Sequence, residues 1–248
     1  MDRARRRACA SALTVAKPEV ASQPDAPTQL VTLDHLRADR YISTLIARAN
    51  DHLSAVGYTE HGHRHAGLVA SIARNILKWL EHPERDAELA AMAAYLHDIG
   101  NVVARDRHWL TSATMALPYL LGLGMDPDEA LTIANAIANH EESSGDISSP
   151  VAAAVVIADK SDVHRSRVQN PDPARFDIHD RVNHAVERSF VRVDCPARSI
   201  ALELTIDTES ASVMEYFEIF LSRMVLCRNA AGSLGCTFEL VVNDQHLA

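Results

Sequence analysis

Hydrophobic residues recur at helical spacing through most of the chain between residues 32 and 163. In the first stripe Leu36, Ile42 and Leu45 share one helix face, and Thr32 can cap its start. Asp126-Pro127 and Ser149-Pro150 are typical helix openings, with a capping side chain followed by proline. The pattern predicts six helices joined by short loops, at 32–56, 59–80, 83–98, 108–123, 126–140 and 149–163. This organisation is typical of an all-α bundle.

The last 60 or so residues follow a different pattern. Apolar and polar residues alternate at 200–206, and a shorter apolar segment at 190–193 precedes a turn at 195–198. An amphipathic helix follows around 213–224, and a closing strand is predicted at 238–242. We therefore expect a mainly α chain with a small C-terminal α+β element of ββαβ order. We expect this element to supply no metal ligand, to provide a contact for a homo-oligomer, and to bury one apolar set together: Phe190, Ile200, Leu202, Phe217, Phe220 and Leu240.

Residues 1–29 differ from both of these parts. They combine a cluster of arginines with a segment too short and polar for a secretion signal, and Pro18, Pro24 and Pro27 interrupt any helix. The predicted organisation is a disordered tail at 1–29, a helical domain at 30–187 and the α+β element at 188–248.

Composition and charge exclude several classes of function. The chain of 248 residues carries a net charge of −9, so it lacks the basic excess that a general nucleic-acid or anionic-membrane binder needs. No apolar run reaches the length of about 18 residues that spans a bilayer. The four cysteines form no paired motif, which favours neither a disulfide framework nor a cysteine zinc site and makes the cytoplasm the expected location.

Histidine is unusually frequent, with 13 residues. Several histidines and aspartates lie at or near the ends of predicted helices: His65, His97, Asp98, His108, His140 and Asp159. Facing helices of a bundle can direct such side chains to one point, and imidazole with carboxylate suits iron, manganese, cobalt or zinc. Most of the other histidines are interpreted as surface or satisfied core residues: His35, His52, His82, His164, His179, His184 and His246.

Charged residues beside these positions are open to two interpretations. Lys160, Arg165 and Arg167 could bind phosphate, or they could belong to a solvated helix end. His61 is interpreted as lining a pocket or supporting His65 from four residues away. Glu141 and Glu142 could act as a base or support a ligand, but surface carboxylates are the more common case.

Three segments together resemble the HD-domain metal-dependent phosphohydrolases. They are the stretch that begins at His65, the segment Ala-Tyr-Leu-His97-Asp98-Ile-Gly-Asn, and Ala-Asp159-Lys-Ser-Asp162. The resemblance implies that His65, His97, Asp98 and Asp159 bind one metal ion. His108 and His140 match the additional histidines of a two-metal subset, in which Asp98 would bridge the ions. Iron or manganese is then the favoured cofactor, with cobalt, nickel or zinc as further candidates.

The same resemblance implies a function. It predicts hydrolysis of a nucleotide or similar small phosphate ester by metal-activated water, with Asp98 and Lys160 catalytic and His61, Lys160, Arg165 and Arg167 binding the substrate. The sequence departs from the cyclic-dinucleotide branch, because Asn139 precedes His140 and no Gly-Tyr-Pro follows. Two alternatives stay open. One is a di-iron oxygenase on the same fold, and the other is a non-catalytic module that binds a nucleotide or mediates assembly.

Overall fold

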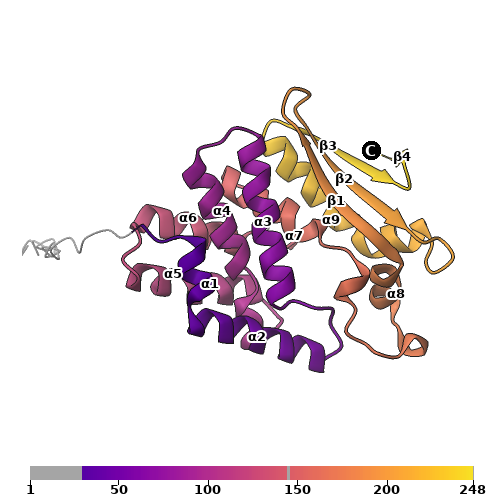
Figure 1. Ribbon diagram of the computed structural model, residues 1–248, viewed down its shortest axis with the longest axis horizontal. Helices are drawn as coiled ribbons and strands as arrows, with labels where there is room; N and C mark the ends of the chain where they lie inside the picture. Colours follow the sequence, from indigo (N-terminus) through magenta and orange to yellow (C-terminus); the bar gives the residue numbers. More distant parts are fainter. Residues whose placement is uncertain (1–29, 144–145, 248) are drawn as a thin grey trace, which may run out of the picture.

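The computed structural model describes residues 30–143 and 146–247, so the predicted tail at 1–29 lies outside the described residues. Helices fill the first part, and a small sheet with a long helix forms the last part (Figure 1). The helices of the first part are α1 (Leu33–Ala38), α2 (Arg40–Ala55), α3 (His63–Trp79), α4 (Glu84–Leu96), α5 (His108–Gly122), α6 (Pro127–Ala138) and α7 (Pro150–Ser161). Short helical turns follow α4 and α7, namely η1 (Ile99–Val102), η2 (Arg165–Arg167) and η3 (Pro173–Arg175), the last of which precedes α8 (Ile178–Ala185).

Helices α4 and α7 form the centre of the helical part. All residues from 87 to 96 of α4 and from 151 to 158 of α7 are buried, which is the state expected of a helix that is apolar on every face. Both helices are rich in alanine, and α3 packs against both of them. Because α4 and α7 both end in ionisable residues, their packing carries these groups into the interior.

Helix boundaries differ from the predicted ones at two points. The first predicted helix is divided at Asp39, whose carboxylate accepts hydrogen bonds from the backbone N–H groups of Tyr41 and Ile42 and so begins α2. Helix α3 begins at His63 with Gly62 as its N-cap, four residues after the predicted start at Thr59. The other four predicted helices correspond to α4, α5, α6 and α7.

The C-terminal element has the predicted ββαβ order followed by one further short strand. Its strands are β1 (Val186–Asp194), β2 (Ser199–Ile206), β3 (Thr237–Val242) and the short β4 (Gln245–His246), and α9 (Val213–Ser233) lies between β2 and β3 in sequence. Strand β2 pairs antiparallel with β1 and parallel with β3. Helix α9 contacts both the sheet and α7, so it lies between the sheet and the helical part (Figure 1). Within the described residues, no helix combines the length and apolarity that crossing a membrane requires.

One predicted core residue of this element is not in the core. Phe190 is 40% exposed, whereas Ile200, Leu202, Phe220 and Leu240 are buried. Phe190 pairs with Glu203 on the outer face of the sheet, because side chains alternate along β1 and its neighbour Val191 faces inward opposite Leu202. Its ring lies under the guanidinium groups of Arg188 and Arg192 instead.

Candidate metal centre

The six residues predicted as ligands meet at one place in the helical part, here called the metal centre. Their positions come from helix ends that converge: His65 from α3, His97 and Asp98 from the end of α4, His108 from the first residue of α5, His140 from just beyond α6, and Asp159 from the last turn of α7. The four imidazoles are almost fully buried, and Asp98 and Asp159 expose only about a tenth of their side chains.

Each histidine is held through its Nδ1 atom. Nδ1 of His97 lies 2.6 Å from the carbonyl oxygen of Ala94, and Nδ1 of His140 lies 2.6 Å from that of Ile137. A carbonyl oxygen can only accept, so these nitrogens carry the proton and donate it. Nδ1 of His65 lies 2.6 Å from a carboxylate oxygen of Asp162, and Nδ1 of His108 lies 3.2 Å from the carbonyl oxygen of Arg105.

The Nε2 atoms of these rings consequently face one another with their lone pairs. Nε2 of His65 is 3.2 Å from Nε2 of His97, and Nε2 of His108 is 3.2 Å from Nε2 of His140. Two unprotonated nitrogens at this separation repel each other unless a cation or a proton lies near both. A histidine that donates from one nitrogen to a carbonyl or carboxylate and presents the other is the usual form of a metal ligand. The residues present therefore fit a divalent metal.

Asp98 is placed between the two histidine pairs. Its Oδ2 atom lies 3.1 Å from Nε2 of His97, and its Oδ1 atom lies 3.1 Å from Nε2 of His108. The Nδ2–H of Asn101 donates to the same Oδ1 and fixes the carboxylate plane. Asp159 lies on one side only, with Oδ1 3.3 Å from Nε2 of His65. The two oxygens of Asp98 thus point toward different ligand groups.

The potential ligand atoms form three overlapping groups, each with all atoms within 4.8 Å of one another. These groups are His65 with His97 and Asp159, His97 with Asp98 and His140, and His108 with His140 and Glu141. All six predicted ligands occur in them. Glu141 is the addition, and its Oε2 atom lies 3.9 Å from Nε2 of both His108 and His140. The sequence left Glu141 between a supporting role and a surface position, and it is in fact half-buried beside the centre.

The charged side chains of the metal centre shift one another's pKa values. Burial disfavours the charged form of His97, but Asp98 and Asp159 outweigh burial and raise the pKa of His97 to about 10. Burial would raise the pKa of Asp98, but the charge of His97 and the close approach of His108 hold it well below its usual range. Burial and the neighbouring charge of His97 outweigh the attraction of Asp159 and hold the pKa of His140 well below its usual range. The centre thus holds ionised carboxylates next to nitrogens that protons and metal ions compete for.

Lys160 and Asp162 support the carboxylate and histidine side chains. The buried ammonium of Lys160 lies 2.9 Å from Asp159, 3.5 Å from Glu141 and 3.6 Å from Glu142. Burial would lower the pKa of Lys160, but these three carboxylates outweigh it and raise the pKa. All three donors of the ammonium group thus face carboxylates. Asp162, two residues after Lys160, pairs with Arg64 at 2.7 Å and orients His65.

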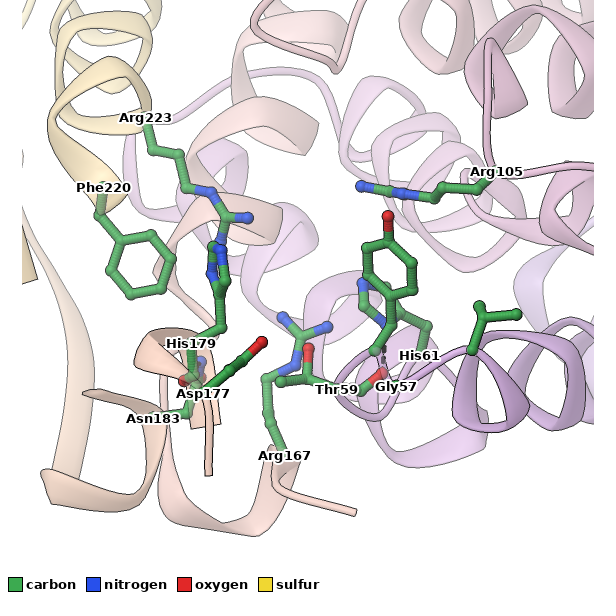
Figure 2. Close-up of a pocket in the computed structure, with 12 residues that line it drawn as sticks. Gly57, Thr59, His61, Arg105, Arg167, Asp177, His179, Asn183, Phe220 and Arg223 are labelled. Carbon is green, nitrogen blue, oxygen red and sulfur yellow. Dashed lines mark hydrogen bonds between the residues drawn. The ribbon is translucent and has the colours of Figure 1, made fainter. Parts of the chain in front are cut away.

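A cavity of about 400 Å³ adjoins the metal centre. We call it the arginine pocket, because Arg105, Arg167 and Arg223 line it together with His61 and His179 (Figure 2). His61 and the three arginines also line the small hollow directly over the metal centre, so the two spaces meet there. Figure 2 shows these side chains directed toward a common space from several elements, with Arg223 coming from α9.

The structure brings some of the predicted substrate residues to this pocket and leaves one away from it. Arg167 is buried and lines the pocket, and His61 lies beside His65, with ring centres 5.3 Å apart. Arg165 points elsewhere, because its exposed guanidinium pairs with Glu187 at 2.8 Å. Arg105, His179 and Arg223 were not identified from the sequence. Arg223 is 64 residues beyond Asp159 (223 − 159), and no local motif marks it.

Comparison with known proteins finds a family match around the centre. Residues 62–163 match the family described as the HD domain, so this region of the chain is similar to that domain. All six predicted ligands lie inside the matched range, whereas Arg167, His179 and Arg223 lie beyond it. The chain is also 28% identical over 201 residues to an uncharacterized protein of Methanocaldococcus jannaschii, an alignment that covers 71% of this chain and 76% of that protein.

Proposed function

We propose that this HD domain is a metal-dependent phosphohydrolase that releases inorganic phosphate from a nucleotide or a similar phosphate ester. The observation that carries the proposal is the pair of opposed Nε2 contacts at 3.2 Å, which need a cation or a proton between them, next to a cavity lined by three arginines. HD domains as a family are generally metal-dependent hydrolases, which agrees with this chemistry.

The donor set fits two divalent ions. His65, His97 and Asp159 would hold one ion, His108, His140 and Glu141 the other, and Asp98 would bind both through its two oxygens. Mixed imidazole and carboxylate donors suit iron or manganese, with cobalt, nickel and zinc as alternatives. When bound, such ions polarise phosphoryl oxygens and lower the pKa of a coordinated water.

The arginines supply the substrate contacts. A guanidinium binds phosphate through two parallel N–H donors, and Arg105, Arg167 and Arg223 all line the space above the centre. Hydrolysis breaks the ester P–O bond, transfers the phosphoryl group to water and leaves a proton on the released alcohol. We assign Lys160 to positioning Asp159 and Glu141, since its ammonium already faces three carboxylates. Arg165 has no part in the proposed site.

Two histidines on the same helix provide the test. Purified protein is reconstituted with Mn²⁺ or Fe²⁺, and phosphate release is measured over a panel of nucleotides and sugar phosphates. His65→Ala should abolish release and lower the bound metal, because it removes a buried ligand. His63→Ala is the control, because His63 is exposed on the first turn of α3 and contacts only Ser43 among the contacts described. Equal loss in both variants would contradict the site.

The same metal-loaded protein also distinguishes a hydrolase from the two alternative functions, a di-iron oxygenase and a non-catalytic binding module. Oxygen uptake by the iron-loaded protein without phosphate release would establish an oxygenase in place of a hydrolase. Binding of nucleotides, seen as a shift in melting temperature, without turnover under any metal would establish a binding module. Phosphate release that depends on metal and on His65 would exclude both.

A further inference from the structure

The arginine pocket is positively charged within an acidic protein. Three arginines and a single carboxylate, Asp177, line it, whereas the whole chain carries a net charge of −9. The carboxylate of Asp177 already accepts the backbone N–H of Asp180 as the N-cap of α8. Arg223 also pairs with Glu142 at 3.2 Å and Arg105 with Glu141 at 3.8 Å, but neither of these carboxylates lines the pocket. The excess of cationic side chains on the lining indicates a space that receives an anion.

The aromatic rings of this pocket support the arginines. The guanidinium of Arg223 lies over the ring of Phe220 at 4.5 Å, and that of Arg105 lies over Tyr58 at 5.3 Å. Phe220 is only 1% exposed, so its ring is not available for stacking with a planar base. Contact with these rings therefore holds the guanidinium groups of Arg105 and Arg223 in place, where they can bind an anion.

Arg167 is fixed from behind. Its Nε and Nη2 groups donate to the carbonyl oxygen of Glu60, and Nη1 donates to that of Asp162, at 2.8–3.0 Å. Three of its five N–H donors are used by these bonds, and its side chain is 4% exposed. A buried cation with unused donors at a cavity wall costs free energy that a bound anion would recover. The described carboxylate nearest to Arg167, Asp162, lies 3.7 Å away and is shared with Arg64.

We propose that the arginine pocket binds a second phosphate group of the substrate, so that the preferred substrate carries two phosphates, one at the metal centre and one on Arg167 and Arg223. This inference rests on the proposed hydrolase function and names the substrate class. The pocket of about 400 Å³ falls in the size range of small-molecule sites, and it opens directly onto the metal centre. Arg167, His179 and Arg223 all lie outside the matched HD domain, so the selectivity belongs to the C-terminal part of this chain.

Matched substrate pairs test the proposal. Phosphate release by the manganese-loaded protein is measured for adenosine 5′-monophosphate against adenosine 3′,5′-bisphosphate, and for fructose 6-phosphate against fructose 1,6-bisphosphate. We expect kcat/KM to be at least 10-fold higher for the bisphosphate of at least one pair. Equal values within both pairs would overturn the proposal.

Two arginines of α9 supply the variant and its control. Arg223→Gln should raise KM for the preferred bisphosphate at least 10-fold more than it raises KM for the matching monophosphate, with little change in kcat. Arg228→Gln should leave both substrates unchanged, because Arg228 is exposed and lines a different, apolar groove. Arg105→Gln serves as a second variant on a separate segment and should act in the same direction as Arg223→Gln.

A non-hydrolysable probe separates this inference from the proposed function. Binding of methylenebisphosphonate and of methylphosphonate to the metal-loaded protein is measured by calorimetry. If no ester is hydrolysed, but Arg223→Gln weakens binding of the bisphosphonate more than binding of methylphosphonate, the hydrolase function fails and the second phosphate site stands. If esters are hydrolysed, but Arg223→Gln affects both probes equally or neither, the second site fails and the hydrolase function stands.

Discussion

At the scale of single residues, the direction of each histidine is decided by the partner of its Nδ1 atom. The carbonyl oxygens of Ala94 and Ile137 and the carboxylate of Asp162 each accept that proton, and this leaves Nε2 as a lone-pair donor. Two of these partners are backbone atoms one helical turn earlier in the chain. Substitution of the neighbouring side chains would therefore not free the His97 and His140 rings, and the centre is built largely by helix geometry.

Asp98 should be more important for metal binding than His108. Asp98→Ala removes an anionic group that faces both histidine pairs, whereas His108→Ala removes a donor from one of them. We expect Asp98→Ala to abolish phosphate release and to lower the affinity for both ions. His108→Ala should lose affinity for one ion and keep close to one equivalent of metal. Mass spectrometry measures the metal content of the two variants, and a phosphate assay measures their activity. Wild-type release by Asp98→Ala at saturating metal would contradict the assignment.

Metal binding should release a proton. In the metal-free protein Asp98 and Asp159 raise the pKa of His97 to about 10 against the opposing effect of burial, so His97 is protonated at pH 8. A metal ion needs the same nitrogen deprotonated, and so apparent affinity should rise with pH by about tenfold per unit for one proton below pH 10. Calorimetric titration of Mn²⁺ in two buffers of different ionisation enthalpy counts the protons. A count of zero at pH 8 would contradict a protonated His97.

The sequence was sufficient to identify six side chains that the structure brings together, but not the residues around them. His97 and Asp98 follow a fully apolar segment, and this juxtaposition alone requires a partner for them. Arg223 could not be found this way, because it reaches the site only through the packing of α9 on α7. Arg165 shows the opposite case, since closeness to Asp159 in sequence did not predict the direction of its side chain.

At the scale of elements, the turn η1 holds the start of α5 against the end of α4. Gly100 of η1 approaches the first turn of α5, and its N–H donates to Oγ of Ser112 at 2.7 Å. A Cβ at Gly100 would lie 2.5 Å from the backbone nitrogen of Ser112 and closer still to the carbonyl oxygen of His108. The absence of a side chain therefore places His108 beside Asp98.

Gly100→Ala should damage both stability and the metal centre. The new methyl group must push the α5 backbone away, which on the scale of overpacked cores costs about 1–3 kcal/mol of the free energy of unfolding. Displacement of His108 should also lower metal content. Urea unfolding of the metal-free protein and metal analysis measure the two effects.

Gly122→Ala is the matched control for this variant. A Cβ at Gly122, the last residue of α5, meets no atom within 4 Å, so the substitution should be neutral or stabilise by up to about 1 kcal/mol. Equal behaviour of the two alanine variants would show that the close approach at Gly100 is unimportant.

Element boundaries were predictable where local chemistry determines them. Asp126-Pro127 and Ser149-Pro150 begin α6 and α7 as expected, and Asp126 and Ser149 each cap the following backbone N–H groups. The division at Asp39 was missed because the apolar stripe continues across it and conceals the cap. Phe190 was assigned to the core on hydrophobicity alone, but the register of β1 against β2 decides its face.

At the scale of the whole molecule, the metal centre and α9 join parts that are distant in sequence. Ligands come from α3, the end of α4, α5, the end of α6 and α7, so bound ions would connect most of the helical part. Helix α9 packs on α7, whose last turn carries Asp159, and sends Arg223 to the same site. The C-terminal element is thereby coupled to the centre although it holds none of the six predicted ligands.

Removal of metal should lower the stability of the whole molecule in one step. A ligand present at 100 times its dissociation constant stabilises the folded state by about 2.7 kcal/mol, and a chain of this size shifts by about 2–4 °C per kcal/mol. Chelation should therefore lower the melting temperature by about 5–10 °C for each ion lost.

Because α9 contacts both α7 and the sheet, we expect strands β2 and β3 to lose protection from hydrogen exchange together with α7. Circular dichroism measures the shift, and hydrogen exchange with mass spectrometry follows the peptides separately. Two separate transitions, with only the helical part sensitive to metal, would show that the C-terminal element folds independently of the centre.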